Sequence, residues 1–305
     1  MPTSEIGALF HVVHVAPSLG QLIPWYRELF GAQCFMEPSY SETEQREASL
    51  ELIGDDYVIE PMTPPHTPGG EQTNIGRFLG RYGSHLHSIA WYAQDIGGLY
   101  GRLTAQGVRV NGGGGVPLTT APTGQFAAIY AHPRDAHCQL EFLSVGDEGY
   151  MRTDPRHAPG FSARYWREEQ PLGIQRTSHI TVVVRDLDHP TQLYEQALGT
   201  PRIYEGGSEQ YGTQSVFFAV GPQSVVEFAR PVAAGLAQQD LEAHGEIVHA
   251  VTFRVRDLDR ALAHVRHLGI RTMEESASAF TLDPEDAFGA VYRFTTADVP
   301  GDPRA

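Results

Sequence analysis

The sequence repeats one pattern four times, and this repetition limits the folds open to the chain. Each copy has a short apolar run that begins with His, a small or acidic residue that can start a helix, a helical stretch, and a Gly that ends it. The copies span residues 11–31, 87–107, 179–199 and 249–269. Runs of alternating apolar and polar residues follow each Gly, which is typical of β-strands. The sequence therefore predicts an α+β protein of four βαβββ modules.

A chain of 305 residues suits two domains, each made of two modules. We assign residues 1–148 to an N-terminal domain and residues 175–305 to a C-terminal domain. The modules within them span residues 1–62, 84–148, 175–231 and 246–305. Residues 149–174 are rich in Arg, Pro, Gly and Glu without periodicity, and they are predicted to form a linker. Residues 63–83 join the first two modules, and we expect them to be partly helical.

Composition limits the partners of the protein. A net charge of −15 argues against nucleic acid or an anionic membrane surface, because both require clustered Lys and Arg. No signal peptide and no apolar run of the ~18 residues needed to span a membrane are evident. The two cysteines, Cys34 and Cys138, form no CxxC motif. We therefore expect a cytoplasmic protein that binds a small molecule, with a homodimer as an open alternative.

Two segments, HVVHVAPSLGQLIPWYRELFG and HITVVVRDLDHPTQLYEQALG, resemble the opening βα unit of the vicinal oxygen chelate superfamily. This superfamily includes glyoxalase I, methylmalonyl-CoA epimerase, extradiol dioxygenases and bleomycin-resistance proteins. The segment AHPRDAHCQLEFL is similar to the hairpin and last strand of the epimerase-like members. The resemblance implies that two modules pair into an open, cupped sheet whose hollow holds a divalent metal ion. We call the hollows of the two module pairs the N-terminal cup and the C-terminal cup.

The resemblance also implies which residues could bind the ion, because the ligands come from the first and last strands of each module. In the N-terminal cup these positions hold His11, Glu60 and Glu141, with Ser88 where a second His is expected. Imidazole and carboxylate donors suit Fe, Mn, Ni, Co or Zn, and open positions on the ion can bind two vicinal oxygens of a substrate.

Strand alternation predicts which first-strand histidines face the cups. In the second module, His87 shares a face with bulky apolar residues, so it is predicted to face the helices. A one-residue bulge would instead rotate His87 into the cup and complete a metal-binding set of His11, Glu60, Glu141 and His87. His85 is a further possible donor. In the fourth module, the same alternation predicts that His249 faces the helices.

The C-terminal cup is predicted to hold no metal ion. His179 and Glu227 face it, but Ala250 and Arg293 stand where two further ligands are expected. Arg293 would bring a fixed positive charge to the position of the ion and could neutralise Glu227. A structural role, without substrate, is therefore expected for this cup.

Three functions remain open at this point. The first is a metal-dependent isomerase or lyase in which Glu60 or Glu141 transfers a proton on a small oxygenated substrate. The second is an extradiol-type dioxygenase, whose iron would require His87 or His85 as a second imidazole. The third is a metal-free protein that binds or sequesters a small molecule. A purely structural explanation also exists, since a buried Glu can simply pair with an Arg.

Overall fold

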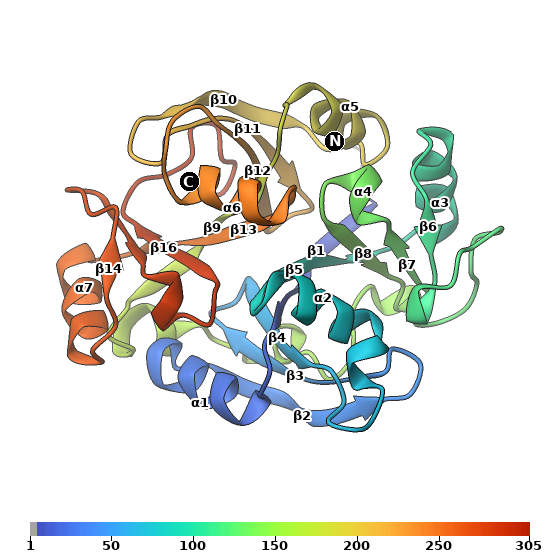
Figure 1. Ribbon diagram of the computed structural model, residues 1–305, viewed down its shortest axis with the longest axis horizontal. Helices are drawn as coiled ribbons and strands as arrows, with labels where there is room; N and C mark the ends of the chain where they lie inside the picture. The colour runs from blue at the N-terminus through green and yellow to red at the C-terminus, as the bar shows by residue number, and fades with distance from the viewer. Residues whose placement is uncertain (1–4) are drawn as a thin grey trace.

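The structure, a computed structural model, describes residues 5–305 and contains two mixed sheets of eight strands each (Figure 1). The strands of the N-terminal sheet are β1 (Ile6–Val15), β2 (Gln33–Ser41), β3 (Arg46–Ile53), β4 (Tyr57–Thr63), β5 (His85–Ala93), β6 (Val110–Asn111), β7 (Ala128–Ala131) and β8 (Gln139–Leu143). Those of the C-terminal sheet are β9 (Ile174–Val183), β10 (Arg202–Ser208), β11 (Thr213–Val220), β12 (Ser224–Pro231), β13 (Ile247–Val255), β14 (Thr272–Met273), β15 (Ala279–Leu282) and β16 (Val291–Thr295).

The helices connect these strands as the repeated pattern predicts. They are α1 (Leu19–Phe30), α2 (Asn74–Tyr82), α3 (Ile96–Ala105), α4 (Pro133–Ala136), α5 (Asp188–Gln196), α6 (Leu236–His244) and α7 (Leu258–His267). The structure confirms the predicted α+β class and the open sheets. Within residues 5–305, no helix combines the length and the apolar character needed to cross a membrane.

Each sheet is built around the first strands of two modules. The strand order is β2-β3-β4-β1-β5-β8-β7-β6 in the N-terminal sheet and β10-β11-β12-β9-β13-β16-β15-β14 in the C-terminal sheet. Strand β1 pairs antiparallel with β5, while β4 lies parallel to β1 and β8 lies parallel to β5. The first and last strands of two modules therefore lie side by side at the centre of the sheet.

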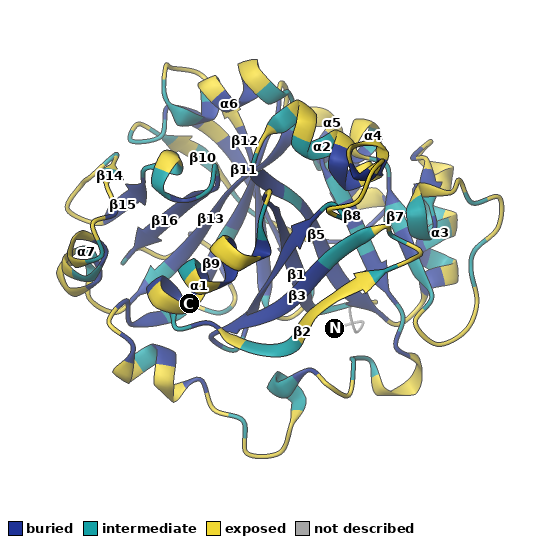
Figure 2. Ribbon diagram, turned by 60° about the horizontal axis from the view of Figure 1, so that its bottom comes forward, coloured by how far each residue is buried: buried dark blue, intermediate teal, exposed yellow. Residues whose placement is uncertain are grey.

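Local sequence explains where the helices begin and end. Asp95 and Asp257 cap α3 and α7, because their carboxylates accept hydrogen bonds from backbone N–H groups in the first turn. Gly31 ends α1 in the left-handed conformation with φ 63°, which favours glycine. The helices expose their outer faces while the central strands are buried (Figure 2).

The two sheets share one continuous apolar core. Phe30, at the end of α1, is fully buried, and its ring lies 5.5 Å from that of Phe253 and 5.2 Å from that of Tyr292. Tyr57 on β4 also contacts Phe253, with ring centroids 5.1 Å apart. Because burying an aromatic ring contributes roughly 1.5–3 kcal/mol, these contacts hold the N-terminal and C-terminal sheets in a fixed arrangement.

The predicted linker packs against the N-terminal sheet. Trp166 is 1% exposed, and the Gln170 side chain donates a hydrogen bond to the backbone oxygen of Leu29 at 2.7 Å. Arg156 donates to the backbone oxygen of Leu9 at 2.8 Å and pairs with Asp154. The segment thus covers part of the core instead of acting as a loose tether.

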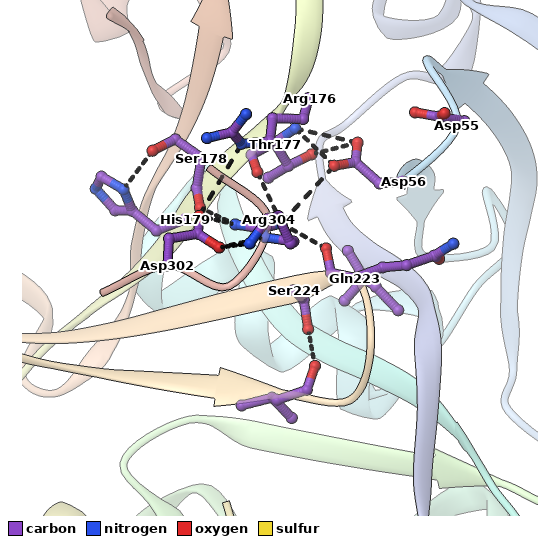
Figure 3. A network of polar contacts seen from close by, with 12 residues as sticks. Asp55, Asp56, Arg176, Thr177, Ser178, His179, Gln223, Ser224, Asp302 and Arg304 are labelled. Carbon is purple, nitrogen blue, oxygen red and sulfur yellow. Dashed lines mark hydrogen bonds and ion pairs between the residues drawn. The ribbon is translucent and has the colours of Figure 1, made fainter. Parts of the chain in front are cut away.

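A polar network at the sheet interface involves the turn before β4 and the end of the chain (Figure 3). The Asp56 carboxyl group accepts hydrogen bonds from the backbone N–H and the hydroxyl of Thr177 on β9, at 2.9 to 3.1 Å. Arg304 donates to the backbone oxygens of Thr177, Ser178 and Gln223 at 3.1, 2.7 and 2.6 Å. Burial, with a smaller contribution from the charge of Asp55, raises the pKa of Asp56 to about 7.

This raised pKa predicts a pH-dependent stability that Asp56→Asn removes. The folded state holds a proton on Asp56 up to about pH 7, whereas the unfolded chain releases it near the ordinary value of 3.8. The free energy of unfolding contributed by Asp56 therefore falls as the pH rises between these values. Urea unfolding should show that the free energy of unfolding of Asp56→Asn, relative to that of the wild type, increases as the pH rises through this range. A constant difference between the two proteins at every pH would contradict the prediction.

Candidate functional site

A cavity of about 650 Å³ occupies the N-terminal cup. The central strands form its floor, and side chains of α2 line its opening, including Asn74, Arg77 and Arg81. Its polar lining from the strands and turns consists of Glu44, Arg46, Glu60, His87, Ser88, Asn111, Tyr130, His132, Gln139 and Glu141. The cavity therefore combines carboxylates, imidazoles and guanidinium groups in one hollow.

His11, Glu60 and Glu141 converge at this cup, each from a different strand. The His11 Nε2 atom lies 3.1 Å from Glu60 Oε2 and 3.4 Å from Glu141 Oε2. The pairing of β1 with β5 places His11 opposite Ala90, and Ala90 in turn lies beside Glu141 in the parallel pair of β5 and β8. The structure thus brings together three of the four predicted metal-binding residues.

The ring of His11 is buried without satisfied hydrogen bonds. Its exposed fraction is 3%, and neither Nδ1 nor Nε2 has a hydrogen-bond partner among the described residues, because the carboxylate contacts have poor geometry. Burial lowers the pKa of His11, but Glu60 and Glu141 raise it more, so the net shift is upward. An imidazole nitrogen between two carboxylates has the donor types that suit a divalent transition-metal ion, although the three ligand atoms do not all lie within 4.8 Å of one another.

Arg46 on β3 partly opposes the binding of a metal ion by these three residues. Its Nη2 atom lies 2.8 Å from Glu60 Oε1, so a guanidinium already neutralises one of the two carboxylates. A cation in the cup would share Glu60 with Arg46 and experience its repulsion. Arg46 was not predicted to be a site residue, because its contact with Glu60 depends on how β3 and β4 pair.

A β-bulge determines the direction of His87. Val12 pairs with Ile89 and His14 pairs with Leu86, so two residues of β5, His87 and Ser88, lie opposite one residue of β1. Both side chains line the cavity, and His87 Nδ1 lies 3.0 Å from Ser88 Oγ. The expectation from simple alternation that His87 faces the helices is therefore wrong.

Burial lowers the pKa of His87 to about 4, so its ring is neutral near pH 7. A neutral imidazole can act as a metal ligand through its unprotonated nitrogen. The metal-binding role of His87 stays a prediction, although the bulge brings its ring to the cavity that contains Glu141.

Sequence reasoning also missed Glu44 and Tyr130. Tyr130 lies opposite Glu141 in the antiparallel pair of β7 and β8, and its hydroxyl donates to Glu44 at 3.4 Å. The backbone N–H of Gly114 donates to the other Glu44 oxygen at 3.1 Å. The negative charge of Glu141 and burial raise the pKa of Tyr130, so its hydroxyl stays protonated. Cross-strand pairing with Glu141 was the signal that could have identified Tyr130.

The C-terminal cup is filled by an internal network around Arg293. The guanidinium carbon lies 3.8 Å from the centre of the Tyr211 ring, and Nε lies 3.8 Å from a Glu274 oxygen. Glu227 instead accepts a hydrogen bond from Thr181 at 2.5 Å. The expected pairing of Arg293 with Glu227 is therefore wrong, because the guanidinium turns toward Tyr211 and Glu274.

The prediction that His249 faces the helices is wrong, because β13 contains a second bulge. Val248 pairs with Val182 and Ala250 pairs with Thr181, which leaves His249 as an extra residue on β13. Its Nε2 atom accepts a hydrogen bond from Arg293 at 3.2 Å, so the ring reaches the cup side of the sheet. Alternation failed here for the same reason as at His87.

Two protein-family models, both described as Glyoxalase/Bleomycin resistance protein/Dioxygenase superfamily, match residues 8–136 and 178–283. Together these segments cover most of the chain, with one segment in each half. The protein belongs to this superfamily, as its strand order and its paired modules also indicate.

The fold is similar to that of a solved structure that matches almost the whole chain. A variant of 4-hydroxymandelate synthase from Streptomyces coelicolor is 14% identical, with a TM-score of 0.64, and the match covers 99% of this chain and 96% of that chain. Methylmalonyl-CoA epimerase from Mycobacterium tuberculosis is 22% identical, with a TM-score of 0.38, and the match covers 43% of this chain and 93% of that chain. A search of curated proteins found no match.

The geometry of the cup predicts opposite effects for two substitutions. Glu60→Gln should weaken the binding of Co²⁺, because it removes a charged oxygen ligand. Arg46→Gln should strengthen it by about tenfold or more, since it removes a positive charge close to the ion. Isothermal titration of the metal-free proteins measures both effects, with Arg77→Gln at the exposed rim as a control of equal charge change. Unaltered Co²⁺ affinity in Arg46→Gln would show that no cation binds beside Glu60.

Proposed function

We propose that the protein is a metal-dependent enzyme that transfers a proton on a small oxygenated molecule in the N-terminal cup. The observation that carries this proposal is the buried His11 ring, which lies between Glu60 and Glu141 with both nitrogens unbonded. His11, Glu60 and Glu141 would hold a divalent ion such as Fe, Mn, Ni, Co or Zn, and His87 would be a fourth ligand. When bound, the ion would polarise oxygen atoms of the substrate as a Lewis acid.

Glu141 is the better candidate for the group that moves the proton. One oxygen of Glu60 is paired with Arg46, and the Glu60 side chain is 3% exposed. The Glu141 side chain is 12% exposed, lines the cavity and has no such Arg partner among the described residues. Glu60 would therefore hold its position through Arg46, while Glu141 accepts and returns the proton.

The lining of the cavity supports a small anionic substrate. Arg77 and Arg81 are exposed on α2 at the opening, where their charges would attract an anion. Val13, Met62 and Phe78 provide apolar walls that exclude water once the substrate is bound. A small organic acid with two neighbouring oxygens matches this combination of charged and apolar lining residues.

Two alternative functions each have an observation in their favour. The bulge at His87 supplies a second imidazole, so His11, His87 and Glu141 would form the two-His, one-carboxylate set of an iron dioxygenase. The pairing of Arg46 with Glu60 favours a metal-free binding protein, because it neutralises a ligand position without an ion.

Proton transfer can be tested with a panel of 2-hydroxy and 2-oxo acids in D₂O. The metal-loaded protein should incorporate deuterium at the carbon beside the oxygenated group of its substrate, as followed by NMR. Glu141→Gln should slow this exchange by roughly 10²–10⁴-fold, which is the usual contribution of a general base. Glu42→Gln, on an exposed turn outside the cup, is the matched control.

The same preparation separates the alternatives. Oxygen uptake with catechols and no deuterium exchange would favour the dioxygenase. Purification without chelators that yields a protein free of transition metal, and unable to bind added Co²⁺ in the cup, would contradict the proposal and favour the binding protein.

A further inference from the structure

A second group of potential metal ligands lies between the two sheets, away from the N-terminal cup. It consists of His85, the first residue of β5, and of Asp240 and His244, which lie one turn apart on α6. One ligand atom from each residue lies within 4.8 Å of the others. Because Asp240 and His244 have i, i+4 spacing, both side chains reach toward β5 from the same face of α6.

The hydrogen bonds of His85 leave one ring nitrogen facing a carboxylate. Nδ1 lies 2.9 Å from the backbone oxygen of Leu86, which can only accept, so the ring proton of a neutral His85 lies on Nδ1. Nε2 lies 3.0 Å from Asp240 Oδ1. A neutral His85 therefore directs a lone pair at a buried carboxylate oxygen, which is unfavourable unless a second ring proton or a cation bound by both atoms compensates it.

His249 fixes the other oxygen of Asp240. Arg293 has only donors, so His249 Nε2 accepts its hydrogen bond at 3.2 Å, and the ring proton of a neutral His249 lies on Nδ1. That Nδ1 donates to Asp240 Oδ2 at 2.6 Å. Oδ1 is left facing His85 and His244, whose Nδ1 lies 2.6 Å away. Metal sites commonly have this pattern, in which outer hydrogen bonds orient each ligand.

We propose that His85 Nε2, Asp240 Oδ1 and His244 Nδ1 bind a divalent transition-metal ion. Two imidazoles and one carboxylate are a donor set suited to Zn²⁺, Co²⁺, Mn²⁺ or Fe²⁺. The backbone oxygen of Leu86 and the ring of His249 orient the ligands without contacting the ion. We call this group the interdomain site.

The interdomain site has room for further ligands. It opens on a cavity of about 520 Å³, separate from the N-terminal cup, whose lining includes Tyr82, Ser84 and Phe288. Three protein ligands leave positions for water or an oxygen-containing ligand from this cavity. Since His85 belongs to the N-terminal sheet and α6 to the C-terminal half, a bound ion also ties the two halves together.

An additional proton on His85 would also satisfy the contact with Asp240. The experiment must therefore distinguish a protonated His85 from a bound metal ion. Zn²⁺ is titrated at constant pH into the full-length protein after chelator treatment, with the stoichiometry and the rise in Tm as measurements. The variants are His244→Ala, whose side chain is 25% exposed and thus tolerant of change, and His267→Ala, an exposed helical control.

His244→Ala should lower the affinity for the Zn²⁺ ion at the interdomain site by about 100-fold. The part of the rise in Tm that this ion causes should also be lost, whereas His267→Ala should behave like the wild type. Glu141→Gln reports on the N-terminal cup in the same titration, so failure of the cup and failure of the interdomain site are distinguishable. Full Zn²⁺ stoichiometry and affinity in His244→Ala would overturn the proposal. An anomalous difference map of the Zn²⁺-loaded wild type decides independently, by the presence or absence of a peak between the three ligands.

Discussion

The antiparallel pairing of β1 with β5 is the constraint on which the N-terminal cup depends. Neighbouring strands lie about 4.8 Å apart, and successive side chains point to opposite faces, so the register decides which residues meet. With this register, His11 lies between Glu60 on the neighbouring β4 and Glu141, one strand beyond β5. A slip of one residue would turn His11 toward the helices and separate it from both carboxylates.

The fold was predictable because its signals are local. Apolar periodicity, helix caps and terminal glycines recur in each module, whereas the ligand positions of Glu60 and Glu141 were implied only by the resemblance to the vicinal oxygen chelate superfamily. The orientations of His87 and His249 were not predictable by alternation, since each depends on a bulge in the pairing with a neighbouring strand. The contact of Arg46 with Glu60 depends on how two strands of the first module pair, and the contact of His85 with Asp240 joins opposite halves of the chain. Neither could be read from the periodicity of one segment.

The two cups have the same strand order but different polar side chains. Arg293 occupies in the C-terminal sheet the place that Glu141 has in the N-terminal sheet, and Tyr211, Glu274 and His249 surround it. Burial alone would raise the pKa of Glu227, but hydrogen bonds from His179 and Thr181 lower it to about 2. Glu227 is thus a satisfied, charged group within a packed interior. The unbonded nitrogens of His11 have no such compensation, and this contrast favours the N-terminal cup as the place for chemistry.

Tyr82 lies between the two proposed sites, because it lines both cavities. Aromatic contacts run from His244 to Tyr82, from Tyr82 to Phe78 and from Phe78 to His87, with ring centroids 5.9, 4.7 and 4.6 Å apart. A chain of contacts alone does not couple two sites, since coupling requires an element whose position both ligands change. Helix α2 meets the structural part of that requirement, because Tyr82 contacts a proposed ligand of the interdomain site while Phe78 packs on the His87 ring. An ion bound at His244 would affect the N-terminal cup only if it also shifted α2, which carries both contacts.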